Sequence, residues 1–338
     1  MDICFTFDNR YYQYIFVPII SVIENNPGPI NFHLITDKLS KKNEKLIEDW
    51  IRSKGSNAFI YKTDKKQFSV CPVKGVDNDR LTRAAYFRIN IPQILPKEIK
   101  KVLYLDPDVM VLGSLSGLFE LNIDNCPFAV VEVLNKSCNS GVMLMNLEYF
   151  RQHNLSERLF DYIEHNKDKI EYYDQDAFNN LIHGNWYKLP PKYNAGDILL
   201  STLSHVKNMG LLPVYSDEEI EEAKKNPVIV HFAGSFHYKL WYENSIHSGQ
   251  ERYLAYKEKT PMKNAKLKTN YILYLMKGQD KPYEYVKEIV KAQIDKLSSS
   301  DGLKGFFVKS LNSSSKTRKF LYTFISYMLY LKKRYSEK

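Results

Sequence analysis

Short apolar runs alternate with longer segments of helical spacing along the first 200 residues of the chain. Four such runs predict buried strands, at residues 3–7, 32–35, 58–61 and 101–105. Three segments have apolar positions at helical spacing, namely residues 14–24, the segment from residue 41 onward, and residues 83–94. Ser40, with Glu44 close behind, is typical of the start of a helix. Strands that alternate with helices predict an α/β fold.

The pattern continues less regularly toward the C-terminus. Further strands are expected at residues 128–133, 141–146 and 228–232, and a helix is expected at residues 176–183. No internal repeat interrupts the series. The composition changes to lysine-rich helix near residue 250, which predicts a main domain over residues 1–250 and a helical C-terminal extension over residues 251–338.

Positive charge is concentrated at one end of the chain. The 338 residues include 44% hydrophobic and 26% charged residues, an ordinary composition for a globular protein, and carry a formal net charge of +9. Residues 302–338 contain nine lysines and arginines against one acid, Glu337, so nearly all of this excess lies there. The main domain is therefore close to neutral, and we expect no nucleic-acid partner.

The basic segment at residues 302–338 is interleaved with aromatic and aliphatic side chains such as Phe320 and Phe324. This composition is typical of a helix that lies on an anionic membrane surface. The alternative is a solvated charge run whose aromatic side chains pack on the main domain.

The remaining composition favours a cytoplasmic protein. Asp2 and Asp8 stand where a signal peptide has a basic start and an apolar run. No uncharged apolar stretch approaches the roughly 18–20 residues that span a bilayer. The cysteines are scattered without a C-x-x-C pair, at Cys4, Cys71, Cys126 and Cys138. We therefore expect a reduced protein in the cytoplasm, peripheral on the inner face of the cell membrane.

Two carboxylates stand at the end of the predicted strand 101–105. Asp106 and Asp108 are two positions apart, so in extended backbone both side chains project to the same side. Pro107 between them has a fixed φ angle, which stiffens the pair. Oxygen ligands of this kind suit Mg²⁺ or Mn²⁺ bound together with the phosphates of a substrate. The alternative is a turn in which both aspartates only accept backbone hydrogen bonds.

Further polar groups follow at other strand ends. His231 ends the strand expected at residues 228–232, and an imidazole added to two carboxylates shifts the preference toward Mn²⁺. Taken alone, this histidine would more often be buried and satisfied by hydrogen bonds. Gly234 would let backbone approach a diphosphate, and Lys239 would neutralise its charge. Two polar clusters lie in between, at residues 139–141 and 174–176, and the second has the alternative reading of a helix N-terminus.

Taken together, these motifs resemble glycosyltransferase family 8, and most closely its bacterial lipopolysaccharide galactosyl- and glucosyltransferases. The resemblance covers residues 1–245 and rests on six motifs in register, around Asp8 with Tyr11, Arg88, Asp106 with Asp108, Asn139, Asp174 to Asp176, and His231. It implies a GT-A fold, which is a Rossmann-like nucleotide-diphospho-sugar transferase fold, a UDP-sugar donor, Mn²⁺ and retention of anomeric configuration. It also implies a basic, aromatic tail for membrane attachment.

The resemblance implies a role for each matching position. Asp106, Asp108 and His231 would be the metal ligands, while Asp8 and Tyr11 would hold the uracil and the ribose. The donor sugar would be surrounded by the catalytic residues Arg88, Asp174, Gln175 and Asp176, with Asn139 bonded to its hydroxyls. Gly234 and Lys239 would cradle the diphosphate.

Three positions depart from the family pattern. Asn9 and Arg10 replace the usual Asp-Asn after Asp8. Two residues are inserted after Gly234, so His237 competes with Lys239 for the phosphate role. The acceptor-side aspartate of the galactosyltransferases has no clear match, and Glu132 is the nearest candidate.

The sequence thus predicts a retaining hexosyltransferase that moves galactose or glucose from UDP-galactose or UDP-glucose, with Mn²⁺ or Mg²⁺ as cofactor. The acceptor would be a hydroxyl of a glycan, glycolipid or glycoprotein in lipopolysaccharide or polysaccharide biosynthesis. Attack on the face that UDP leaves is favoured over a covalent intermediate on Gln175 or Asp176. Two other hypotheses remain: a metal-dependent nucleotidyltransferase or UDP-sugar hydrolase, and a non-catalytic carbohydrate-binding membrane adaptor.

Overall fold

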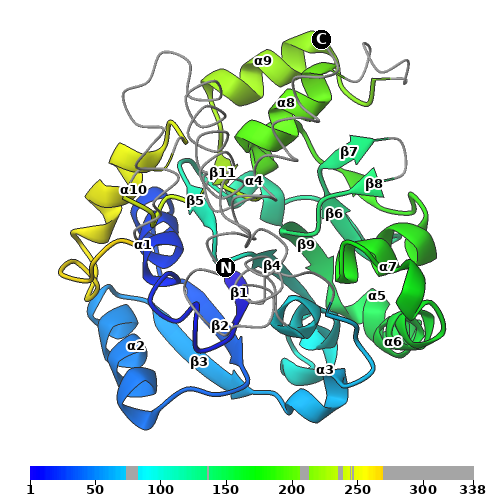
Figure 1. The fold of residues 1–338 in the computed structure, drawn as a ribbon, viewed down its shortest axis with the longest axis horizontal. Coiled ribbons are helices and arrows are strands. Elements are labelled where there is room, and N and C mark those ends of the chain that lie inside the picture. Colours follow the sequence, from blue (N-terminus) through cyan, green and yellow to red (C-terminus); the bar gives the residue numbers. More distant parts are fainter. Residues whose placement is uncertain are drawn as a thin grey trace, which may run out of the picture.

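A seven-stranded sheet forms the centre of the molecule in the computed structural model (Figure 1). The structure describes residues 1–73, 83–134, 137–205, 213–234, 239–243, 245 and 247–268. The sheet order is β10-β6-β9-β4-β1-β2-β3. Its members are β1 (Asp2–Phe7), β2 (Asn31–Thr36), β3 (Asn57–Lys62), β4 (Lys101–Leu105), β6 (Phe128–Val130), β9 (Val142–Asn146) and β10 (Tyr187–Lys188).

The direction of the strands creates a crevice between β1 and β4. Strand β1 pairs in parallel with both β2 and β4, and β3 continues the parallel series beyond β2. The chain therefore proceeds outward from β1 to β3 and then returns to the other side of β1. Ligands in open α/β sheets bind at the carboxyl ends of the strands at such a reversal. Strand β9 runs antiparallel to β4 and β6, so the loop that enters β9 lies at this same edge.

Alternating residues of the central strands pack on opposite faces of the sheet. Ile3, Phe5 and Phe7 of β1 are buried with α1 (Phe16–Asn25) and α2 (Lys41–Ser53). Cys4 of the same strand faces the other core. That second core contains the 3₁₀ helix Arg83–Asn90 and the helices α3 (Ile91–Ile94), α5 (Leu147–Gln152), α6 (Leu155–His165) and α7 (Asp174–Ile182).

The remaining elements lie around this three-layer body. They are α4 (Ser116–Phe119), α8 (Asp197–His205), α9 (Asp217–Lys225), α10 (Gln250–Lys257) and three further 3₁₀ helices (Lys65–Phe68, Lys167–Lys169, Pro191–Asn194). Two small antiparallel sheets pair β5 (Val109–Val111) with β11 (Ile229–His231), and β7 (Glu132–Leu134) with β8 (Ser137–Cys138).

Polar side chains of α1 hold the segment that follows the two predicted metal ligands. Val111 N donates to Ser21 Oγ at 2.9 Å, and Asn25 Nδ2 donates to Val111 O at 3.0 Å. Leu115 N donates to Asn26 Oδ1 at 2.7 Å. Because these backbone groups are buried, the contacts satisfy donors and acceptors that would otherwise destabilise the fold. Helix α1 therefore fixes β5, and with it the position of Asp108.

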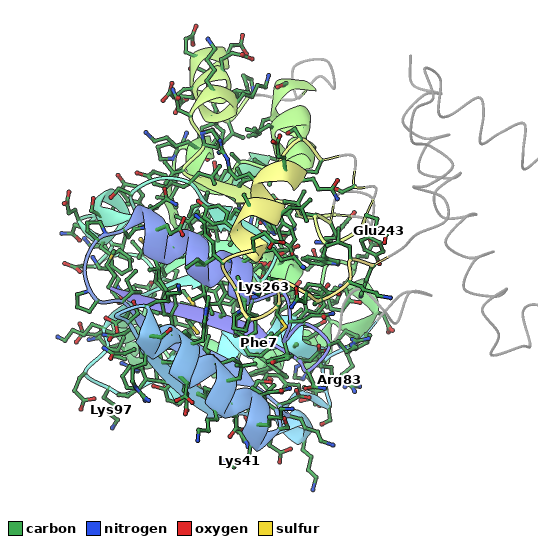
Figure 2. The ribbon with its side chains drawn as sticks, turned by 90° about the vertical axis from the view of Figure 1, so that its left-hand side faces the viewer. Phe7, Lys41, Arg83, Lys97, Glu243 and Lys263 are labelled. Carbon is green, nitrogen blue, oxygen red and sulfur yellow. The ribbon has the colours of Figure 1, made fainter. Side chains whose placement is uncertain are left out.

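An aromatic cluster attaches the segment 239–268 to α1 and the loop before it. The Trp241 ring stacks on Tyr14 with 4.2 Å between centroids, and Phe232 meets Trp241 edge-on. Lys268 N donates to Trp241 O at 2.8 Å, which ties the end of the described chain to the same place. Figure 2 views the molecule from this side, with α10 above α1 and α2.

Most of the elements predicted from the sequence are confirmed. The strands at residues 3–7, 32–35, 58–61 and 101–105 are present, and Ser40 caps α2 by accepting from Asn43 N. Three predictions were wrong in detail. Residues 83–90 form a 3₁₀ helix rather than α-helix, the strand expected at 128–133 divides at Val131, and α7 begins at Asp174. The acids at 174 and 176 thus lie within its first turn.

The predicted C-terminal extension is described only in part. Residues 269–338, with the basic segment expected to lie on a membrane, fall outside the described residues. None of the helices in the described part of the chain combines the length and the apolar character that crossing a bilayer requires.

Candidate functional site

A cavity of about 460 Å³ opens at the carboxyl ends of β1 and β4. Loops from distant parts of the sequence contribute its walls because they all end at the same edge of the sheet. Eleven of the site residues predicted from the sequence line it: Asp8, Tyr11, Arg88, Asp106, Asp108, Asn139, Asp174, Gln175, His231, Gly234 and Lys239. The motifs predicted from the sequence are therefore brought together in one cavity.

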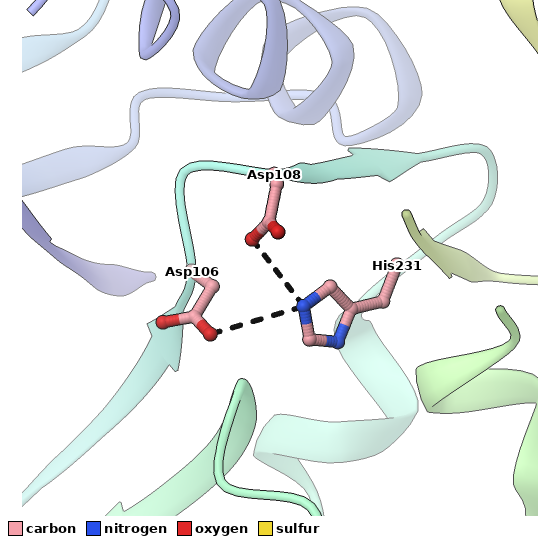
Figure 3. Close-up of side chains that lie close together, drawn as sticks. All are labelled: Asp106, Asp108 and His231. Carbon is pink, nitrogen blue, oxygen red and sulfur yellow. Dashed lines mark ion pairs between the residues drawn. The ribbon is translucent and has the colours of Figure 1, made fainter. Parts of the chain in front are cut away.

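Asp106, Asp108 and His231 converge inside this cavity (Figure 3). His231 Nε2 lies 3.3 Å from Asp108 Oδ1 and 3.8 Å from Asp106 Oδ2. Antiparallel pairing of β11 with β5 aligns His231 with Val109, and Phe232 N donates to Asp108 O at 3.0 Å. The backbone register of two short strands thus places the histidine beside the carboxylates.

Each of these three side chains has a second polar atom, which contacts a neighbouring residue. Asp106 Oδ1 accepts from Tyr104 Oη and lies 3.0 Å from Arg88 Nη2. Asp108 Oδ2 accepts from the Lys239 ammonium, and His231 Nδ1 is 2.9 Å from Asn194 Oδ1. Each side chain is therefore oriented, and Asp106 Oδ2, Asp108 Oδ1 and His231 Nε2 face one another within 4.8 Å.

This donor set fits a divalent cation. Two carboxylate oxygens and one imidazole nitrogen suit Mn²⁺ better than Mg²⁺, which prefers oxygen alone. The space for the cluster depends on Gly141, because a Cβ there would lie 2.2 Å from His231 Cε1 and 2.7 Å from Asp106 Oδ2. Burial favours the neutral form of Asp108, but Lys239 and His231 outweigh it, and the pKa lies well below its usual range. The ion pair with Lys239 thus favours the ionised form of Asp108.

Arg88 joins the two sides of the cavity. Its buried guanidinium lies 3.0 Å from Asp106 Oδ1 and 3.1 Å from Asp174 Oδ2, and Nη1 donates to Ser140 O at 2.6 Å. Burial raises the pKa of Asp174 to about 6, although Arg88 opposes the shift. Asp174 Oδ2 is fully buried and is held by its ion pair with Arg88.

Gln175 and Asn139 lie together beside Arg88. Asn139 Nδ2 donates to Gln175 Oε1 at 3.2 Å, and Ser140 N donates to the same oxygen at 3.4 Å. The turn entering β9 and the first turn of α7 therefore form one polar wall.

Asp176, which was predicted as a catalytic residue, is not among the residues that line the cavity. Its Oδ2 accepts from Glu171 N and Tyr172 N, both at 2.7 Å, so it closes the turn before α7. Glu132 is also absent from the lining, and its Oε1 accepts from Trp186 Nε1 at 2.9 Å.

The opposite wall is aromatic and basic. Tyr11 meets Trp241 edge-on at 5.7 Å between ring centroids, and burial raises the pKa of the Tyr11 hydroxyl. Asp8 accepts from Arg10 N at 2.9 Å, so the residues that depart from the family pattern support this carboxylate. Gly234 has a φ of 102°, a left-handed conformation that favours glycine. His237 lies outside the described residues.

The residues that sequence reasoning missed include Tyr104, Asn194 and Lys268. Tyr104 orients Asp106, Asn194 contacts His231, and Lys268 reaches the cavity wall from the segment beyond residue 250. The alternation of β4 could have identified Tyr104 as facing away from Leu103 and Leu105. The other two depend on contacts between segments far apart in the sequence.

Comparison with known proteins agrees with this geometry. Residues 2–245 match the model of the family described as Glycosyl transferase family 8. General stress protein A of Bacillus subtilis (strain 168) is 26% identical over 268 residues, which cover 74% of this chain and 90% of that protein. Lipopolysaccharide 1,2-glucosyltransferase of Escherichia coli (strain K12) is 23% identical over 282 residues, covering 78% and 79% of the two chains.

Solved structures show the same architecture. The galactosyltransferase LgtC in complex with donor and acceptor sugar analogues superposes with a TM-score of 0.65 at 23% identity, covering 77% of this chain and 96% of that one. The glycosyltransferase GlyE of Streptococcus pneumoniae TIGR4 gives a TM-score of 0.57 at 22% identity, covering 75% and 60%. These likenesses confirm the predicted GT-A fold.

Replacement of Gly141 by alanine tests the space around the cluster. We expect Gly141→Ala to weaken binding of Mn²⁺ at least about tenfold, because the added methyl group displaces His231 or Asp106. Titration calorimetry with Mn²⁺ measures the change. Gly117→Ala is the matched control, since its Cβ meets only Tyr193 Oη at 3.4 Å. Unchanged affinity in a folded Gly141→Ala protein would contradict the assignment of this cluster.

The raised pKa of Asp174 predicts a pH-dependent cost to stability. The pKa of Asp174 is about 6 in the folded protein and about 3.9 in the unfolded chain. Its contribution to the free energy of unfolding is therefore fully present at low pH and is lost as the pH rises through 6. Relative to Asp174→Asn, the native protein should lose up to about 3 kcal/mol of unfolding free energy between pH 4 and pH 7. Urea unfolding of both proteins across this range measures the difference, and a constant difference would contradict the buried ionisation.

Proposed function

Because the chain belongs to glycosyl transferase family 8, we propose that this glycosyltransferase is a hexosyltransferase that moves galactose or glucose from a UDP-sugar to a hydroxyl group. The observation that carries the proposal is the convergence of Asp106, Asp108 and His231 in a cavity at the sheet edge where α/β proteins bind nucleotides. The transfer would retain the anomeric configuration of the sugar.

The three converging side chains would hold Mn²⁺ through Asp106 Oδ2, Asp108 Oδ1 and His231 Nε2. When bound, the ion would act as a Lewis acid that neutralises negative charge on the departing diphosphate. Tyr104, Lys239 and Asn194 form hydrogen bonds to the remaining polar atoms of these side chains. The side chains therefore need little reorganisation when a cation arrives.

The aromatic and basic wall would bind the nucleotide part of the donor. Tyr11 and Asp8, at the end of β1, would contact the uracil and the ribose. The left-handed backbone at Gly234 allows close approach of a diphosphate, and the Lys239 ammonium beside Asp108 is placed to balance its charge. Lys268 adds a second positive charge to the same wall.

The polar wall would bind the donor sugar. Asn139 and Gln175 line the cavity and would bond to the sugar hydroxyls, with the buried ion pair of Arg88 and Asp174 beside them. An amide such as that of Gln175 is a weak nucleophile, and the Asp176 carboxylate accepts hydrogen bonds from the backbone of Glu171 and Tyr172. Both observations favour attack by the acceptor on the face from which UDP departs.

The acceptor would be a growing cell-envelope glycan or glycoconjugate. The lipopolysaccharide glucosyltransferase of Escherichia coli supports this choice, because it aligns with most of the chain. We further propose that residues 302–338 hold the enzyme on the inner face of the cell membrane, since their basic and aromatic side chains suit an anionic surface.

Substitution of Asp108 tests the proposed chemistry. Asp108→Asn should lower turnover of a UDP-sugar at limiting Mn²⁺ at least about hundredfold, because several kcal/mol of charge stabilisation depend on the bound ion. Release of UDP from UDP-galactose, UDP-glucose and UDP-N-acetylglucosamine measures the rate and identifies the donor. Asp49→Asn on the exposed surface of α2 is the control. Near-native turnover in Asp108→Asn would contradict the metal assignment, and release of pyrophosphate would indicate a nucleotidyltransferase.

Deletion of residues 302–338 tests the membrane proposal. The truncated protein should keep its activity on a small soluble acceptor, because every residue of the proposed site lies before residue 269. It should lose binding to vesicles that contain anionic lipid. Binding of the full chain should weaken with salt, because the Debye length falls from about 10 Å at 0.1 M to about 3 Å at 1 M. Loss of folding on truncation would show instead that the aromatic residues belong to the core.

A further inference from the structure

Asn194 lies fully buried beside the proposed metal ligand His231. It ends the 3₁₀ helix Pro191–Asn194, and the chain then runs alongside β11. Ala195 N donates to Ile229 O at 2.8 Å, and His231 N donates to Ala195 O at 3.1 Å. The backbone therefore fixes the two residues next to each other before their side chains interact.

Asn194 is linked through Asn139 to Gln175 by hydrogen bonds. Two backbone N–H groups determine which atom donates in each of them. Gly141 N donates to Asn139 Oδ1 at 3.1 Å, and Ser140 N donates to Gln175 Oε1 at 3.4 Å. A backbone N–H group can only donate, so both oxygens are acceptors. The contact of 3.2 Å between Asn139 and Gln175 is consequently a donation from Asn139 Nδ2 to Gln175 Oε1.

The orientation of the Asn194 amide follows from that of Asn139. Asn194 Nδ2 lies 2.9 Å from Asn139 Oδ1 and donates to it. Asn194 Oδ1 therefore faces His231 Nδ1 at 2.9 Å, where it can only accept. The proton of this hydrogen bond must come from Nδ1, which leaves Nε2 to face Asp106 and Asp108.

We infer that Asn194 is a positioning residue that fixes the Nδ1–H tautomer of His231, so that the Nε2 lone pair is available to a divalent cation. This inference rests on the proposed function, because it takes the cluster of Asp106, Asp108 and His231 to be the cation site. Histidine ligands generally donate their second ring N–H to an oxygen acceptor, and loss of that acceptor typically costs about 10–100-fold in metal affinity.

The tautomer can be measured directly in the metal-free full chain. Protein labelled with ¹⁵N-histidine is examined by NMR, and the pH is raised until the two ring ¹⁵N shifts of His231 stop changing. The resonances of His231 are identified by their loss in His231→Gln. We expect the proton on Nδ1, whereas an unrestrained histidine in water favours Nε2. A proton on Nε2 in the native protein would overturn the inference, and this measurement requires no variant of Asn194.

Two substitutions at Asn194 separate positioning from packing. Asn194→Leu removes the acceptor at similar volume, and it should raise the Kd for Mn²⁺ about 10–100-fold. Asn194→Asp keeps an oxygen toward Nδ1 and should bind Mn²⁺ more tightly than the leucine variant. Asn146→Leu is the control, because it removes a buried asparagine that caps α5 at the opposite end of β9. The control should lower thermal stability without changing Mn²⁺ affinity.

The outcomes distinguish this inference from the proposed function. The positioning role would be overturned if Asn194→Leu bound Mn²⁺ as tightly as the native protein. It would also be overturned if Asn194→Asp and Asn194→Leu bound Mn²⁺ equally weakly. Failure of the native protein to bind Mn²⁺, with and without UDP, would overturn the proposed metal site. In that case the ¹⁵N measurement would still report whether Asn194 sets the tautomer.

Discussion

Repulsion among clustered carboxylates is the constraint on which the site depends. Asp106, Asp108 and Asp174 lie in one buried region, where isolated negative charges would be very costly. Arg88 bridges Asp106 and Asp174, and Lys239 pairs with Asp108. The fold brings these cations from the 3₁₀ helix Arg83–Asn90 and from the segment after β11. These ion pairs offset the repulsion among the three carboxylates.

Much of this arrangement could be predicted from the sequence. Asp8 and Asp106 each follow a buried strand of the central sheet, so their position at one edge could be predicted. His231 ends β11 of a separate small sheet, and only the order of the motifs grouped it with them. The motifs also had the order expected of a known family. These signals are local, since they require only the alternation of a strand and the identity of the residue that follows it.

The remaining features depend on contacts that a local pattern does not contain. Asp176 has the same chemistry as Asp174, yet the start of α7 points one into the cavity and the other toward the backbone of Tyr172. Asn194 belongs to no periodic segment, and only its register beside β11 gives it a role. Arg83–Asn90 has helical spacing, but it follows the tighter 3₁₀ path. Tertiary packing decided each of these outcomes.

The stacking of Tyr14 on Trp241 has a consequence for how the protein folds. The two rings come from opposite ends of the described chain, and their contact closes a very long loop. Such distant contacts form late, because the entropy of the intervening chain must be lost first. A ribosome releases the N-terminal strands long before Trp241 is made. The newly synthesised sheet therefore presents its acidic edge to solvent, and the pocket is completed only when the last segment docks.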